Sequence, residues 1–352
     1  MRWLLSRLRN AATAAIAIGL KYVAVAIALC RWRTDYIVER QSGERSLAGA
    51  KRVAIFVHYD RRGRVHDYVL HYLNSLQAVG FELVFVSNAP RLSAESWAKL
   101  QPLCALILRR KNIGYDFAAY KDSIAALGNV AELDELLLVN DSVYGPFGDL
   151  APILSRCDPR RAVVWGMTDC WFRRFHLQSY FLLFKQPALA SEAFARFWNK
   201  VLYVQSKGWI IEKYEIGLTQ AMTRSNLRCA AIYPYRRVAE VLGAAVASLQ
   251  EPPEDEAEDE KPRNVVLKEH QKFAVSMADA IERGSPLNST HHLWDVLLTE
   301  FGCPFLKREL LELNPLGIPS LQRWESLLRG AFDYDTDLIL RHLEVQARNR
   351  AV

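Results

Sequence analysis

The chain has 352 residues, of which 51% are hydrophobic and 24% charged, with 17 glycines and 14 prolines. This balance excludes a disordered chain, and the lack of a regular glycine period or a long heptad run excludes collagen and coiled coil. The six cysteines are scattered without a C-x-x-C pair, which argues against a disulfide framework or a zinc ribbon and is typical of a reducing cytosol; the net charge of +6 is mild for this length.

The first 33 residues carry six basic side chains and no acidic one. Within them, residues 11–30 (AATAAIAIGLKYVAVAIALC) are almost wholly apolar and long enough to span a bilayer. However, Lys21 lies mid-span, where a charge costs about 3 kcal/mol on insertion scales. No A-x-A site marks a secretory signal, and a helix packed on its own domain is the alternative. We expect residues 1–33 to form a membrane-associated helix that lies on or dips into the inner leaflet, with basic flanks that favour anionic head groups; whether residues 11–30 span the membrane stays open. Because the basic excess is concentrated at this end, nucleic acid is not an expected partner.

Strands and helices alternate from residue 51 onward. Short apolar runs rich in β-branched residues predict strands, and apolar residues three and four apart predict helices. In chain order the expected elements are strand 52–58, helix 65–79, strand 81–87, helix 92–100, strand 104–108, helix 116–127, strand 135–139, strands 162–165 and 179–184, and helices 189–203 and 215–222. This alternation predicts an α/β fold with a mostly parallel sheet and helices on both faces.

Composition then marks out four parts of the chain. Residues 250–263 (QEPPEDEAEDEKPR) hold seven acids and two bases among prolines, which predicts a linker or an exposed loop. We expect the apolar helix within 1–33, an α/β domain over 51–249, the acidic segment 250–263, and a largely helical C-terminal portion over 264–352.

Polar residues follow each of the first four expected strands. The clusters are His58-Tyr59-Asp60, Ser87-Asn88, residues 111–116 and Asn140-Asp141-Ser142. Ligands of open parallel sheets bind outside the carboxyl ends of the strands, so these clusters predict a ligand crevice along one sheet edge.

Several common ligand signatures are missing. The chain has no G-x-G-x-x-G after the first strand, no G-x-x-x-x-G-K-[ST], no G-x-S-x-G and no H-E-x-x-H. What remains is Asp141, just past an apolar strand, where a carboxylate can hold a divalent cation against a diphosphate, with Asn140 and Ser142 as neutral contacts. The alternative is that Asp141 merely caps the following turn.

The segment 111–116 (KNIGYD) offers further contacts. Lys111 can meet phosphate, Asn112 and Asp116 can bond sugar hydroxyls, and Gly114 permits close approach of the backbone. Asp116 can also cap the helix that follows, a role compatible with binding.

At this point the residues show a resemblance to a known family. The segments that carry it are VAIFVHYD (53–60), ELVFVSNA (82–89), RRKNIGYDFAAYKDSI (109–124), LLLVNDSVYGPF (136–147), WGMTD (165–169), HLQSYFLLF (176–184), NSTHHLWDVLL (288–298) and GCPFLKRELL (302–311). Together they resemble the rhamnan synthesis F family of bacterial surface-polysaccharide enzymes, in order from about residue 51 to 315. The resemblance implies a GT-A-like glycosyltransferase with a Rossmann-type sheet and an acceptor-binding C-terminal portion.

The resemblance also implies roles for individual residues. His58 and Tyr59 would line the base and ribose pocket, Asn112, Gly114 and Asp116 would face ribose and diphosphate, and Asp141 would occupy the Asp-x-Asp metal position. The sequence departs from that pattern because Asn140-Asp141-Ser142 has one carboxylate. A Mg²⁺ or Mn²⁺ requirement is therefore open, and a Lys or Arg is the alternative partner of the leaving diphosphate. The full set of expected nucleotide-sugar residues is His58, Tyr59, Asn88, Lys111, Asn112, Gly114, Asp116, Asn140, Asp141, Ser142, His291 and His292.

Inverting sugar transfer needs a carboxylate that takes the proton of the attacking acceptor hydroxyl. Glu215, at an expected helix start, is the favoured candidate and Asp169 the next, with Glu212 as a further acid in this region. The alternative for Glu215 is a first-turn acid favoured by the helix dipole. His291 and His292 precede Trp294 and fit a lid over phosphate or metal, whereas a lone histidine is more often a satisfied core residue.

The sequence thus predicts a membrane-associated or cytoplasmic enzyme that transfers L-rhamnose or a related deoxysugar, with dTDP-L-rhamnose as the expected donor. Its acceptor would be a surface polysaccharide such as O-antigen or a lipid-linked precursor. Two rivals stay open: a catalytically silent scaffold that binds sugar nucleotide or glycan, and a nucleotidyltransferase, for which Asp60–Arg64 (DRRGR) faintly resembles a basic glycine-containing loop.

Overall fold

The computed structural model describes residues 19–30, 35–248 and 262–350. Most of the expected N-terminal segment and of the acidic segment 250–263 therefore lies outside the described residues. Residues 19–30 are helical, and Leu20, Tyr22 and Val23 there are 65%, 64% and 56% exposed. Over the described ranges, no helix has both the length and the apolar character needed to cross a membrane.

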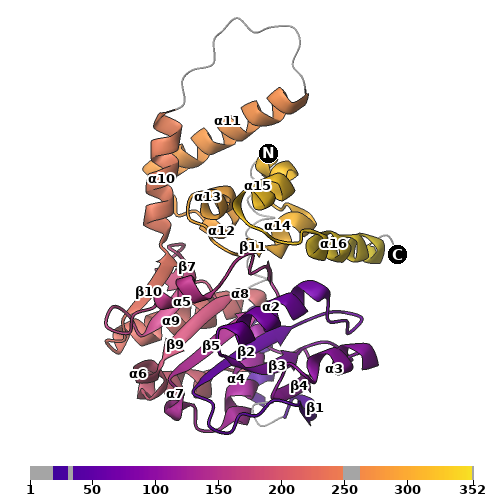
Figure 1. Ribbon diagram of the computed structural model, residues 1–352. Helices are drawn as coiled ribbons and strands as arrows, with labels where there is room; N and C mark the ends of the chain where they lie inside the picture. The colour runs from indigo at the N-terminus through magenta and orange to yellow at the C-terminus, as the bar shows by residue number, and fades with distance from the viewer. Residues whose placement is uncertain (1–18, 31–34, 249–261, 351–352) are drawn as a thin grey trace, which may run out of the picture.

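A central sheet with mostly parallel strands organises the fold (Figure 1). Its strands lie in the order β1 (Ile37–Ser42), β4 (Leu106–Arg110), β3 (Glu82–Ser87), β2 (Arg52–His58), β5 (Glu135–Asn140), β9 (Phe181–Lys185), β7 (Val164–Cys170) and β10 (Cys229–Tyr233), with β8 (His176–Leu177) against β7. The pairs among β2, β3, β4 and β5 are parallel, whereas β1 and β9 run antiparallel to their neighbours. The expected mixed α/β fold is confirmed, although the sequence did not indicate β1 or β10.

Each central strand is buried on both faces, which explains why its sequence is a continuous apolar run. In β2, Ala54 and Phe56 pack with α2 (Asp67–Ala78), while Val53, Ile55 and Val57 pack with α4 (Tyr115–Leu127). The first face also carries α3 (Ala94–Leu100) and α5 (Ala151–Ser155), and the second carries α7 (Glu192–Lys200) and α9 (Ile216–Arg224). The shorter elements are η1 (Val130–Glu132), α6 (Gln186–Leu189), α8 (Lys207–Trp209) and the π-helix η2 (Ile210–Glu215).

The C-terminal portion is helical and lies at one end of the sheet (Figure 1). It comprises α10 (Tyr235–Ala247), α11 (Pro262–Glu282), α12 (Ser289–His292), α13 (Trp294–Thr299), α14 (Arg308–Leu313), η3 (Pro319–Arg323), α15 (Trp324–Ala331) and α16 (Asp337–Arg350). A short strand, β11 (Leu306–Lys307), pairs antiparallel with β6 (Val143–Tyr144), so that Lys307 lies opposite Val143. This pairing places the start of α14 directly beside the end of β5.

A buried charge network fixes the loop between β4 and α4. The Arg110 side chain is fully buried; its Nε donates to Asp122 Oδ2 over 2.7 Å and its Nη1 donates to Asn88 Oδ1 over 2.7 Å. Its Nη2 donates to the carbonyl of Ile113 over 2.9 Å, and the Tyr203 hydroxyl donates to Asp122 over 2.6 Å. One guanidinium thus ties the ends of β3 and β4 to α4.

We predict that Asp122→Ala destabilises the protein by about 3–5 kcal/mol, because it leaves a buried guanidinium without its counter-ion. Urea unfolding followed by circular dichroism measures the change. Glu192→Ala is the matched control: it breaks an exposed pair with Arg196 and should cost less than about 0.5 kcal/mol. A loss below about 1 kcal/mol in Asp122→Ala would contradict the role given to this network.

Candidate active site at the carboxyl ends of the strands

The polar clusters predicted from the sequence lie at the switch point of the sheet. β2 has β3 on one side and β5 on the other, and the chain leaves the carboxyl end of β2 toward α2 on one face while α4 covers the other face. The backbone N–H of Tyr59, after β2, donates to Asp141 Oδ2, after β5, over 3.1 Å. The polar cluster that follows β2 and the one that follows β5 are therefore in contact, as expected.

The carboxyl groups of Asp116, Asp141 and Glu215 lie around this point. Asn140 Nδ2 donates to Asp116 Oδ2 over 2.8 Å, and Asn140 Oδ1 accepts from the Ser142 hydroxyl over 2.6 Å. Burial, together with the charge of Asp141, raises the pKa of Asp116 to about 7. Glu215, the last residue of η2, accepts from the backbone N–H and the hydroxyl of Ser179, each over 3.0 Å.

Two basic residues from β11 and α14 enter the same space. Arg308 Nη1 lies 3.2 Å from Asp141 Oδ2 and donates to the Tyr68 hydroxyl over 2.7 Å, while its Nε donates to Glu312 over 3.0 Å. Lys307 Nζ donates to Ser142 Oγ over 3.2 Å and lies 4.3 Å from the centre of the Tyr180 ring.

The Lys307 ammonium differs from that of an ordinary ion-paired lysine. Burial lowers the pKa of Lys307 to about 8, while the charges of Glu215, Asp116 and Glu309 favour its protonated form. Among the described residues, none of these carboxylates comes within 4.0 Å of its Nζ, so the attraction is not taken up by a direct ion pair. A half-buried cation held this way is ready for an anionic ligand.

The donor set does not fit a divalent cation. Asp141, the expected metal ligand, already has a guanidinium and a backbone N–H on Oδ2. The raised pKa of Asp116 disfavours the ionised form that a metal needs. In the part of the chain that the structure describes, no three His, Cys, Asp or Glu side chains are grouped as a metal site.

Several expected binding residues have structural partners instead. His58 is buried, with Nε2 donating to the Arg64 carbonyl and Nδ1 accepting from the Ser87 hydroxyl, each over 3.1 Å. Asn88 belongs to the Arg110 network. Gly114 has φ +82°, and a Cβ there would lie 2.6 Å from the Ala118 Cβ, so packing alone requires the glycine. Lys111 and Asn112 are exposed.

The remaining candidates, Asp169, His291 and His292, have three different surroundings. Asp169 is buried with both oxygens engaged: Oδ1 accepts from the backbone of Tyr235 over 2.5 Å and Oδ2 from the Trp171 indole over 3.1 Å. His291 belongs to the Lys307 side, where burial and that ammonium lower the pKa of His291 to about 4. His292 Nδ1 donates to the Asn288 carbonyl over 3.1 Å, and its ring lines a separate pocket.

Sequence reasoning missed Lys307, Arg308 and Tyr68. Lys307 and Arg308 lie within the GCPFLKRELL segment, but nothing in the spacing of that segment shows that it pairs with residues 143–144. A basic pair between an apolar strand and a helix start is the one signal available.

Comparison with known proteins agrees with the sequence resemblance. The protein-family model described as "Rhamnan synthesis protein F" matches residues 83–241. This match confirms the expected family resemblance. The matched residues 83–241 include Asp116, Asn140, Asp141 and Glu215, whereas Lys307 and Arg308 lie beyond them.

Curated relatives extend the similarity. The chain is 26% identical to "Virulence protein VirA" of Vibrio anguillarum over 291 residues, covering 81% of this chain and 87% of VirA. It is 31% identical to "Uncharacterized protein y4gN" of Sinorhizobium fredii over 186 residues, covering 51% of this chain and 48% of y4gN. Among solved structures, the glycosyltransferase GlyE of Streptococcus pneumoniae is 12% identical with a TM-score of 0.32, covering 62% of this chain and 60% of that one.

We predict that Asp116→Asn changes how stability depends on pH. The folded state raises the pKa of Asp116 from 3.8 to about 7, so its contribution to stability is full at low pH and is lost as the pH rises between these values. The Asn variant lacks this loss. Relative to the wild type it should therefore be more stable at pH 8 than at pH 5, by about 1–3 kcal/mol.

Urea unfolding at both pH values measures the difference, with the exposed Asp134→Asn as the background. An Asp116→Asn difference that is the same at both pH values, or that has the opposite sign, would show that the carboxyl ionises normally.

Proposed function

We propose that this protein is a glycosyltransferase that uses a nucleoside diphosphate sugar as donor. The observation that carries the proposal is the Lys307 ammonium, which lies at the switch point of the sheet without a direct ion pair and beside Ser142. A diphosphate is the ligand that such a cation, a hydroxyl and an adjacent guanidinium suit best. The family match supports the same class of reaction.

In the proposed reaction, Lys307 neutralises charge on the departing diphosphate. The acceptor oxygen attacks the anomeric carbon, the bond from that carbon to the diphosphate oxygen breaks, and the electron pair leaves on the diphosphate. Glu215 takes the hydroxyl proton through Oε2, because Oε1 is held by Ser179. Attack opposite to the leaving group inverts the anomeric centre.

The finer assignments follow the family. We infer a donor carrying L-rhamnose or a related deoxysugar, with dTDP-L-rhamnose first, and an acceptor that is a bacterial surface polysaccharide or its lipid-linked precursor. We place the protein at the cytoplasmic face of the inner membrane or in the cytoplasm. The exposed apolar side chains of residues 19–30 and the basic residues around them support contact with a membrane surface.

We predict that dTDP binds without a divalent cation and that its affinity falls as the pH rises above about 8. The sign follows from Lys307: its pKa is lowered to about 8, so the free protein loses the binding charge above that pH. Calorimetric titration with dTDP in EDTA measures this. Lys307→Met should weaken binding at pH 7 by about tenfold or more and abolish the pH dependence.

The exposed Lys200→Met is the matched control and should bind dTDP like the wild type. Binding that requires Mg²⁺ or Mn²⁺, or that is unaltered in Lys307→Met, would contradict the proposed role of the lysine.

We predict that Glu215→Gln lowers the turnover number by about 10²–10⁴-fold while donor affinity barely changes, since general-base catalysis contributes that much. Turnover is measured by mass spectrometry of product with saturating acceptor. Asp169→Asn should act mainly through folding stability, because both of its oxygens hold protein groups. Normal turnover in Glu215→Gln with an inactive but folded Asp169→Asn would reverse the assignment. Donor binding by the wild type without any transfer would favour the silent scaffold.

A further inference from the structure

A pocket lies among the C-terminal helices, away from the carboxyl ends of the strands. It has a volume of about 370 Å³ and is lined by α10, α11, α12, α13, η3 and α15. This volume is within the range of small-molecule sites in proteins. Unlike the site around Lys307, it has a largely apolar wall.

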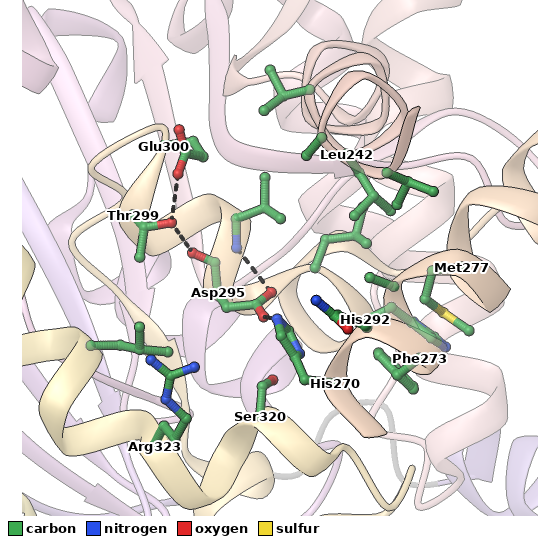
Figure 2. A pocket seen from close by; sticks show the side chains of 18 residues that line it. Leu242, His270, Phe273, Met277, His292, Asp295, Thr299, Glu300, Ser320 and Arg323 are labelled. Atoms are coloured by element: carbon green, nitrogen blue, oxygen red, sulfur yellow. Dashed lines mark hydrogen bonds and ion pairs between the residues drawn. The ribbon is translucent and has the colours of Figure 1, made fainter. Parts of the chain in front are cut away.

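The pocket is divided by polarity, as Figure 2 shows. Leu242, Phe273 and Met277 from α10 and α11 form one side, whereas Asp295, Thr299, Glu300 and Arg323 form the other. Such a division favours a ligand with an apolar chain and a polar head.

The polar side has groups suited to hydroxyls. Asp295 Oδ2 lies 3.5 Å from His270 Nε2, and Glu300 Oε1 accepts from the Thr299 hydroxyl over 3.1 Å. No hydrogen bond or ion pair joins the Arg323 guanidinium to the other residues drawn in Figure 2. Two carboxylates on the same side of the pocket as one guanidinium disfavour a strongly anionic head group and suit a neutral one that both donates and accepts hydrogen bonds.

Helix α12 separates this pocket from the candidate active site. His291 belongs to the Lys307 side, and His292, the next residue, lines the pocket. The same helix is joined to the sheet through Gln178 Nε2, which donates to Thr290 Oγ1 over 3.2 Å and to Asn288 Oδ1 over 3.0 Å. A ligand in the pocket would therefore lie one short helix away from the Lys307 cation.

We propose that this pocket binds the lipid end of an amphipathic glycan acceptor, with the alkyl chain against α10 and α11 and the first sugar against Asp295, Glu300 and Arg323. The identity of the ligand as acceptor rests on the proposed transfer reaction. The binding of a neutral sugar-headed amphiphile does not, because it needs neither donor nor chemistry.

The test is binding of monomeric n-dodecyl maltoside to the full chain, measured by calorimetry below the micelle concentration. Maltose without the chain should bind at least about tenfold more weakly, since the buried alkyl groups supply most of the free energy. Dodecyl phosphate should also bind more weakly, because Asp295 and Glu300 repel its head group.

Two neighbouring alanines of α10 give a matched pair of variants. Both are exposed, and Ala245 lines the pocket whereas Ala244, the residue before it, does not. Ala245→Trp should fill the space and weaken dodecyl maltoside binding by about tenfold or more, whereas Ala244→Trp should leave it within about twofold. Both should keep dTDP binding at the Lys307 site.

The results separate the two proposals. Absent binding of dodecyl maltoside, equal binding of maltose, or equal loss in both alanine variants would overturn the lipid pocket while leaving the donor site intact. Tighter binding of dodecyl phosphate would overturn the neutral head group. Failure of dTDP to bind would instead count against the proposed reaction.

Discussion

The geometry of the candidate site depends on one buried guanidinium. Arg110 satisfies its hydrogen bonds with a carboxylate, a side-chain amide and a backbone carbonyl that come from three different segments. A buried guanidinium without these partners would carry a large desolvation cost, so the three segments are held together. The loop that follows leads directly into α4, and Asp116 occupies the first turn of that helix. Arg110 is fully buried among protein groups, and it helps to fix the position of Asp116 beside Asn140.

The two basic residues of the candidate site, Lys307 and Arg308, differ in their contacts. Arg308 pairs with Asp141 and Glu312, which leaves it little freedom. Within the described part of the chain, the direct contacts of the Lys307 ammonium are a hydroxyl and an aromatic ring. The raised pKa of Asp116 and the lowered pKa of Lys307 both reflect removal from water. Arg308 is thus held in place by its ion pairs, whereas the Lys307 ammonium can still contact an anion. A site of this kind is preorganised by the first cation and can bind a ligand through the second.

The parts of the fold that sequence predicted well are those with local signals. The strand at 52–58 agrees with β2 residue for residue, because its run of apolar and β-branched side chains is buried on both faces. The helix expected at 215–222 corresponds to α9 at 216–224, and Glu215 falls instead at the end of a π-helical turn that no local pattern indicated. β1 was missed because its side chains are mostly exposed, as expected for an edge strand.

The candidate site shows the same division. Asp141 and Asp116 could be found because each follows a recognisable strand or loop, and Glu215 because an acid preceded a helical pattern. His58 and Asn88 looked equivalent to them in sequence, yet they hold protein groups. Whether a polar side chain is open to a ligand or bound to the protein depends on partners distant in sequence, such as Ser87 for His58 and Arg110 for Asn88. Lys307 was out of reach for the same reason, since its place depends on pairing across more than 160 residues.

That pairing has a consequence for how the protein is made. Asp116, Asp141 and Glu215 are synthesised first, and the basic residues Lys307 and Arg308 come after all strands of the central sheet and after helices α10 to α13. The segments from β2 to β5, with Asp116 and Asp141, are therefore synthesised before either Lys307 or Arg308 exists. The charges of the candidate site are brought together only when β11 pairs with β6.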